Sequence, residues 1–120
     1  MINRYECNGR LARVVEHNGI LYLTGRTCGD YEKIEDQTRG LLKIIEDTLE
    51  AYNSDKRHIL RAQIFLKDIA RDFQPMNKVW ESWIEPGYEP ARATVQASMA
   101  REHLLIEIVV TAVTKETNED

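Results

Sequence analysis

The chain switches between two hydrophobic periods. Alternation of apolar and polar residues is typical of half-buried strands, and spacings of three or four residues are typical of amphipathic helices. Asn18 and Gly19 separate two alternating segments, which indicates a tight hairpin. On this basis we predict strands at 4–6, 12–16, 20–24, 59–66, 91–99 and 104–113.

Two segments between these strands place their apolar residues three or four positions apart and are predicted to be helices. The first runs from Ile34 to Tyr52. We expect the second to be capped by Asp72, to carry Pro75 in its first turn, and to end at the Pro-Gly pair at 86–87. The order β-β-β-α-β-α-β-β predicts an α+β fold in which two helices form a single layer on a mixed sheet.

The last two predicted strands, 91–99 and 104–113, are expected to form an antiparallel hairpin. Only residues 100–103 separate them, which favours a direct turn. The simplest register pairs Val95 with Ile108. One face of this hairpin is then apolar throughout, and it is the face that the helices should cover.

The opposite face of the predicted hairpin mixes aliphatic and hydroxyl residues with one base, Arg92, and one acid, Glu107. With no helix left to cover it, this face is expected to pack against another chain or a ligand, which predicts a symmetric oligomer. A sheet that curls over its own face is the alternative. In this register Arg92 and Glu107 are on the order of 13 Å apart. They therefore either form an ion pair across a subunit interface or serve a site separately.

Composition limits the class of protein. With 120 residues, 42% hydrophobic and 30% charged, the chain suits one domain over 1–120, whose polar end at 115–120 is expected to fray. A net charge of −4 argues against a nucleic-acid partner. No apolar run reaches the length of a membrane span and no signal-peptide pattern is present, so we expect a cytoplasmic protein without membrane contact.

The cysteines and histidines offer little chemistry of their own. Cys7 and Cys28 are expected to be free thiols, although Cys28 lies close enough to Gly25 in sequence to stand at the mouth of a cleft. The three histidines lie far apart, whereas metal ligands are typically closely spaced. No metal site is therefore expected.

Several short motifs, in the same order, resemble those of the RidA (YjgF) family over about residues 4–113. The most specific are Pro-Ala-Arg-Ala-Thr-Val at 90–95 and Leu-Ile-Glu-Ile at 105–108. Met-Asn-Lys-Val-Trp at 76–80, with Thr-Val-Gln-Ala at 94–97, is similar to the YoaB-type branch. Other similar strings are Tyr-Leu-Thr-Gly at 22–25, Ile-Phe-Leu-Lys-Asp at 64–68 and Asp-Phe at 72–73.

The resemblance implies a chorismate-mutase-like fold, a homotrimer with a central barrel, and ligand clefts between subunits. It also implies an enamine/imine deaminase that hydrolyses reactive 2-imino acids, such as the imine from 2-aminoacrylate, to 2-keto acids and ammonia. Neither a cofactor nor a metal is implied. The expected ligand is a small molecule that carries a carboxylate.

The resemblance also implies roles for individual residues. Arg92 would grip the substrate carboxylate, which suits the two parallel hydrogen bonds that a guanidinium can donate. Glu107 would hold the attacking water and relay its proton. Thr94 would line the cleft at a position where the family often has cysteine. Three further positions implied near the ligand are Thr24, Gly25 and Asn77.

Two departures from the family pattern bear on substrate choice and on activity. Leu11 stands where many deaminases have a tyrosine, so the expected pocket lacks a hydroxyl. Arg26 replaces the usual glutamine and would add positive charge near the ligand. Two alternatives therefore stay open. One is a non-catalytic protein that binds a small carboxylate or keto acid. The other is an RNA-acting translation inhibitor, a role attached to this family, which the acidic charge and missing stacking platform disfavour.

Overall fold

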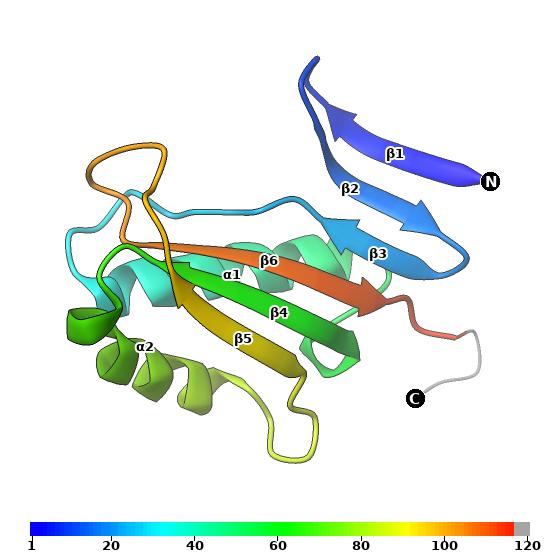
Figure 1. The fold of residues 1–120 in the computed structure, drawn as a ribbon. Coiled ribbons are helices and arrows are strands. Elements are labelled where there is room, and N and C mark those ends of the chain that lie inside the picture. Colours follow the sequence, from blue (N-terminus) through cyan, green and yellow to red (C-terminus); the bar gives the residue numbers. More distant parts are fainter. Residues whose placement is uncertain (117–120) are drawn as a thin grey trace.

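The computed structural model describes residues 1–116, which form a six-stranded sheet with two α-helices on one face (Figure 1). The α+β class and the predicted order of strands and α-helices are confirmed. Neither α-helix of the described chain is long and apolar enough to cross a membrane. The elements are β1 (Ile2–Cys7), β2 (Ala12–His17), β3 (Ile20–Leu23), α1 (Ile34–Ala51), the short 3-10 helix η1 (Lys56–His58), β4 (Ile59–Leu66), α2 (Ile69–Trp83), β5 (Ala91–Gln96) and β6 (Ile106–Val113).

The strands are arranged in the order β1-β2-β3-β6-β4-β5. β4 and β5 run parallel and are connected through α2, whereas the other neighbouring strands run antiparallel. The sheet is therefore mixed, as predicted. β6, the last strand of the chain, inserts between β3 and β4, while β5 forms one edge of the sheet (Figure 1).

The predicted hairpin between the last two strands is wrong, because β4 lies between them. Ile64 of β4 pairs with Thr94 of β5 on one side and with Ile108 of β6 on the other. Both strands are also shorter than predicted. The connection at 97–105 is consequently longer than the expected turn at 100–103, and it crosses the end of β4.

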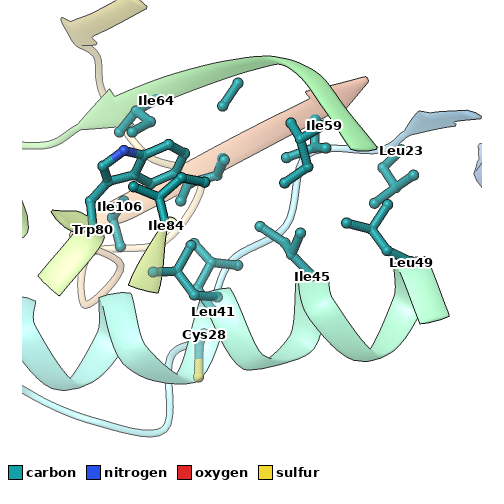
Figure 2. Close-up of a cluster of buried hydrophobic side chains, with 14 of the residues drawn as sticks. Leu23, Cys28, Leu41, Ile45, Leu49, Ile59, Ile64, Trp80, Ile84 and Ile106 are labelled. Atoms are coloured by element: carbon teal, nitrogen blue, oxygen red, sulfur yellow. The ribbon is translucent and has the colours of Figure 1, made fainter. Parts of the chain in front are cut away.

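The apolar stripe of α1 lies against the sheet and forms much of the core. Figure 2 shows Leu41, Ile45 and Leu49 on the side of α1 that faces the strands, with Leu23 and Ile59 opposite. Full burial of each such side chain stabilises the fold by about 1.5–3 kcal/mol relative to exposure. Because α1 and α2 both pack on this face, the opposite face of the sheet has no cover within the described chain.

The second helix begins earlier than predicted. The Asp68 carboxylate accepts a hydrogen bond of 3.1 Å from the Arg71 amide and caps α2 one turn before the expected position. Asp72 is instead buried inside the helix, where its two oxygens accept hydrogen bonds of 2.9 Å from the Arg71 guanidinium. Pro75 therefore lies within the helix rather than in its first turn. The helix ends at Trp83, just before the Pro-Gly pair at 86–87.

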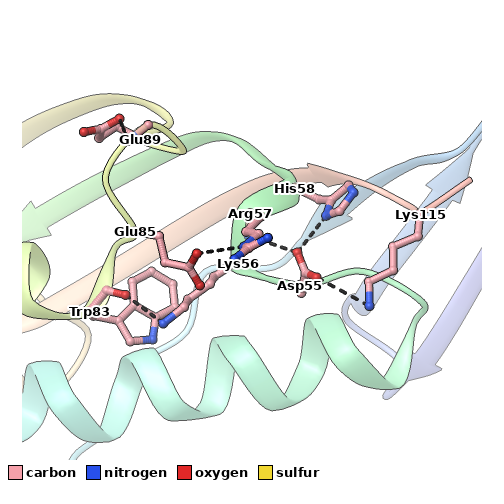
Figure 3. Close-up of polar contacts among 9 residues, drawn as sticks. Asp55, Lys56, Arg57, His58, Trp83, Glu85, Glu89 and Lys115 are labelled. Carbon is pink, nitrogen blue, oxygen red and sulfur yellow. Dashed lines mark hydrogen bonds and ion pairs between the residues drawn. The ribbon is translucent and has the colours of Figure 1, made fainter. Parts of the chain in front are cut away.

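Polar contacts around η1 hold the end of the described chain in place (Figure 3). The Asp55 carboxylate lies 2.6 Å from Nδ1 of His58 and 3.4 Å from Nζ of Lys115. Lys115, the first residue of the tail that was predicted to fray, therefore has a side-chain partner in the structure. Residues 117–120, the rest of that predicted tail, lie outside the described residues.

Candidate functional site

The sheet places the two charged residues of the expected site on opposite faces. Arg92 is paired with Ala62, a residue that is fully buried beneath the helices. Glu107 is paired with Phe65, whose side chain lies on the uncovered face. The prediction that Arg92 and Glu107 share a face is therefore wrong. The predicted register paired β5 directly with β6. In the structure both strands pair with β4 instead, and in this pairing the side chains of Arg92 and Glu107 point to opposite faces.

Arg92 lies in a shallow hollow between β5 and α2, which we call the Arg92 pocket; it includes Asn77, Trp80 and Glu81. The guanidinium carbon is 5.4 Å from the centroid of the Trp80 ring, a cation–π distance. Burial lowers the pKa of the Arg92 guanidinium, and the charge of Glu81 opposes that shift. Among the described residues no carboxylate forms an ion pair with Arg92. A half-buried cation is thus available to an external anion.

Two buried polar atoms near Arg92 have no hydrogen-bond partner in the described chain. They are Oδ1 of Asn77, on α2, and Oγ1 of Thr94, which shares the helix-facing side of β5 with Arg92. Buried polar atoms in native proteins are nearly always hydrogen-bonded to protein or water. Both atoms therefore lack a partner within the described chain and lie beneath the surface beside β5 and α2.

Glu107 lies in a second concavity, which we call the Glu107 hollow; its lining includes Gly25, Thr27 and His103. A Cβ atom on Gly25 would overlap Oε2 of Glu107 and would lie 3.1 Å from its Cδ atom. The carboxylate therefore rests directly on the Gly25 backbone, and a residue with a side chain cannot replace this glycine without moving Glu107. Thr24 lies just before it, and its amide donates a 2.9 Å hydrogen bond to the Arg13 carbonyl.

Arg26 extends the sheet next to Glu107. Its amide and carbonyl form hydrogen bonds of 3.0 and 3.1 Å with Ile108. Burial lowers the pKa of the Arg26 guanidinium and the charge of Arg13 lowers it further, whereas Glu6 acts in the opposite direction. The charges that influence Arg26 thus come from β1 and β2.

Two residues that the sequence placed near the cleft have other surroundings. Leu11 is 44% exposed just before β2. Cys28 is buried beneath α1, where a Cβ atom on Gly40 would lie 2.7 Å from its sulfur (Figure 2). The alternative that Cys28 stands at the mouth of a cleft is therefore wrong, whereas the expectation of a free thiol is confirmed. Both cysteines of the chain are free.

Sequence reasoning missed Gln37, a fully buried residue of α1 that holds both walls of the Glu107 hollow. Its Nε2 atom donates to the carbonyls of Tyr31 and His103 at 2.8 and 2.9 Å, and its Oε1 atom accepts from the Leu105 amide at 2.9 Å. A signal was present in the sequence. Gln37 follows Ile34 by three residues and so occupies the core-facing stripe, where a polar residue needs buried partners.

Comparison with known sequences gives a consistent result over nearly the whole chain. The family profile described as "Endoribonuclease L-PSP" matches residues 1–114. A RutC family protein of Haemophilus ducreyi is 36% identical over 113 residues, which cover 93% of this chain and 96% of that protein. The RutC family protein YoaB of Escherichia coli K12 is 39% identical over 111 residues, or 92% of this chain and 96% of YoaB.

A more distant relative carries a functional name. The chloroplastic protein of Arabidopsis thaliana named Reactive Intermediate Deaminase A is 29% identical over 107 residues, which cover 83% of this chain and 56% of that protein. Among solved structures, NMB1025 from Neisseria meningitidis, described as a member of the YjgF protein family, superposes with a TM-score of 0.94 at 36% identity. That superposition covers 98% of both chains.

Proposed function

The chain belongs to the RidA/YjgF (RutC) family, and from this premise we propose that it hydrolyses reactive 2-imino acids to 2-keto acids and ammonia. The imine derived from 2-aminoacrylate is the substrate we have in mind. The relative named as a reactive intermediate deaminase supports this reaction class. We propose no metal or cofactor, because the residues assigned below suffice for hydrolysis of an imine.

The observation that carries the proposal is the separation of Arg92 and Glu107 onto opposite faces of the sheet. On the helix-covered face, the half-buried Arg92 guanidinium has no carboxylate partner in the described chain. On the uncovered face, the Glu107 carboxylate lies against the backbone of Gly25. We propose that neighbouring subunits of a symmetric ring bring the Arg92 pocket of one chain against the Glu107 hollow of the next. The two half-sites then face one cleft.

The uncovered sheet face supports the proposed assembly. Tyr22 is 47% exposed and Val95 is 44% exposed, and both pair with residues of this face. Apolar side chains gathered on a sheet face without cover indicate an interaction surface. We propose that these faces meet in a homotrimer whose sheets line a central barrel.

The proposed roles follow from the chemistry of each residue. Arg92 binds the substrate carboxylate through two hydrogen bonds, while Asn77 and Thr94 supply polar atoms beside it. Glu107 orients the attacking water and accepts its proton. Gly25 lets the backbone approach the ligand closely. Thr24 and Arg26, next to Gly25, complete the proposed ligand-binding set.

A protein that binds a small keto acid without turnover is the second candidate. Leu11 favours it, because this position has no hydroxyl and the side chain is exposed. A third reading, action on RNA, follows the endoribonuclease name of the family profile, but a net charge of −4 disfavours binding to phosphate.

The decisive experiment generates a 2-imino acid with an amino-acid oxidase or a serine dehydratase and follows its decay with the wild-type protein and with Glu107→Gln. We expect the wild type to accelerate ammonia release, and the variant to lose most turnover while it keeps keto-acid binding and the oligomeric mass. Dissociation of the variant into monomers would show instead that Glu107 is an interface residue. Binding without turnover in the wild type would favour the second candidate.

A further inference from the structure

Two glycines of the segment after β3 seat two side chains that can carry protons. Gly25 lies beneath the Glu107 carboxylate. Gly29, four residues later, lies beneath the His103 imidazole: a Cβ atom on Gly29 would be 2.7 Å from Nε2 and 3.0 Å from Cδ2 of that ring. A side chain at position 29 would therefore force the imidazole to move. The segment that follows β3 therefore contacts the Glu107 carboxylate at Gly25 and the His103 imidazole at Gly29.

The carboxylate and the imidazole line one concavity, the Glu107 hollow. Asp30 and Arg101 also line it, so the imidazole shares the hollow with two acids and one base. The neighbouring Glu102 is engaged elsewhere, because its carboxylate lies 3.0 Å from Nζ of Lys67. His103 is exposed to this space rather than packed in the core.

Buried Gln37 fixes the backbone that carries His103. The side-chain nitrogen of Gln37, Nε2, donates hydrogen bonds to two backbone carbonyls. One belongs to Tyr31, in the segment with Gly29, and the other belongs to His103, in the 97–105 connection. The same side chain accepts a hydrogen bond from the Leu105 amide, just before β6. The wall with Gly29 and the wall with His103 are therefore joined through one core residue, which limits their relative movement.

We propose that His103 is the general acid that protonates the departing ammonia, with Glu107 as the base for water. This inference rests on the proposed imine hydrolysis and adds a second proton-transfer residue to it. The two ring nitrogens of an imidazole can donate and accept a proton, which suits a group that donates a proton and recovers it in each cycle. The shared hollow places His103 on the same side of the cleft as Glu107.

The proposed steps balance. Water oxygen bonds to the carbon of the protonated imine (C=NH2+), the C=N π pair moves to nitrogen, and Glu107 takes a proton from the water, which gives a neutral carbinolamine with an NH2 group. His103 then gives its proton to nitrogen of the carbinolamine, and the C–N bond breaks with its electron pair leaving on ammonia. The remaining hydroxyl loses its proton to solvent as the keto group forms. Proton exchange through solvent returns Glu107 to the carboxylate and His103 to the imidazolium.

The test compares His103→Gln with His17→Gln, a matched control at an exposed histidine of β2. We expect His103→Gln to lower kcat for imine hydrolysis about 100-fold and to leave KM and keto-acid binding close to wild type. The pH dependence of kcat should change in this variant and stay like wild type in His17→Gln. An unchanged rate and pH profile in His103→Gln would overturn the inference and leave the proposed function standing.

A second variant, Gly29→Ala, displaces the imidazole without removing it. The added methyl group meets the ring end of His103 and lies 3.1 Å from Cδ2 of Leu104, so a small shift of these two side-chain ends accommodates it. We expect a folded protein with a lowered kcat and an altered pH profile. Wild-type kinetics in Gly29→Ala would contradict the inference. A wild-type protein that does not hydrolyse imines at all would overturn both this inference and the proposed function.

Discussion

At the scale of the residue, Arg92 combines three features that belong together in an anion site. Its guanidinium lies over Trp80, is half-buried, and has no carboxylate partner in the described chain. The sequence identified the residue from its motif. It did not show that Trp80 lies beneath the guanidinium, because that contact depends on β5 pairing with β4 rather than with β6.

The Arg92 side chain is expected to supply most of the affinity for a small keto acid such as pyruvate. A guanidinium–carboxylate pair in a sheltered site contributes roughly 1.5–3 kcal/mol. Arg92→Ala should therefore weaken binding roughly 10- to 100-fold in calorimetry. Arg92→Lys should lose much of the same affinity, because an ammonium cannot form both hydrogen bonds.

Arg26→Gln belongs in the same titration series as a control for the second arginine. If Arg92→Ala binds pyruvate as well as wild type while Arg26→Gln abolishes binding, the anion site is at Arg26. The role carried to Arg92 by the family resemblance would then be wrong for this chain.

The sequence did not predict the surroundings of two buried side chains, Cys28 and Gln37. Cys28 follows Gly25 closely in sequence, yet it packs beneath α1, because the segment between β3 and α1 folds back onto the helix. For Gln37 the sequence showed a polar residue on the core-facing stripe, but it did not show what the side chain binds. Its three partners are backbone groups of loops, and such partners leave no pattern of their own in the sequence.

At the scale of the element, hydrophobic periodicity located every strand and both α-helices, but it did not give the order of the strands. A short connection between 91–99 and 104–113 favoured direct pairing. The alternation within β4 was visible, yet nothing local showed that both of its edges would be paired. The order of strands in a sheet depends on contacts between distant segments of the chain. The hydrophobic periodicity of one segment carries no information about those contacts.

The predicted start of the second helix was wrong for a simpler reason. Asp68 and Asp72 are one helical turn apart, and both are residues that cap helices well. Proline at 75 favoured Asp72, because proline is common in the first turn. The structure uses Asp68 as the cap and buries Asp72 against the Arg71 guanidinium instead.

The contacts at η1 predict how stability responds to acid. Burial alone would raise the pKa of the Asp55 carboxyl, but hydrogen bonds and charge from His58, a hydrogen bond from the Arg57 amide and one from Lys115 lower it overall. A pKa that is lower in the folded state gives stability above the unfolded value, about 4, and that stability is lost as pH falls through the folded pKa.

The measurement compares urea unfolding of wild type and Asp55→Asn at pH 7 and pH 3. Wild type should lose more unfolding free energy between these pH values than Asp55→Asn does. Asp47→Asn removes an exposed carboxylate on α1 and serves as the matched control. Equal losses in wild type and Asp55→Asn would show that the Asp55 contacts do not contribute.

At the scale of the whole molecule, the sheet has one face beneath two helices and one face without cover in the described chain (Figure 1). The bare face was predicted from the alternation of the last two strands, and its existence is confirmed. Its composition differs from the prediction, since Arg92 points to the helix side. The proposed trimer explains both the bare face and the divided site.

Sedimentation velocity at micromolar concentration tests the assembly directly. We expect a single species with three times the chain mass of 13.9 kDa, because burial of the bare faces should favour association over the free monomer. A monomer under these conditions would contradict the proposed trimer. It would also leave the Arg92 pocket and the Glu107 hollow without a shared cleft.

The placement of Arg92 and Glu107 on opposite faces has a genetic consequence. If each cleft takes Arg92 from one chain and Glu107 from the next, two inactive alleles can complement each other. Every ring that mixes Arg92→Ala and Glu107→Gln chains keeps one cleft built from two unaltered half-sites. Co-expression in equal amounts should thus restore roughly a quarter of wild-type activity in a closed three-membered ring. Separately purified variants should stay inactive, and a site contained within one chain would show no rescue.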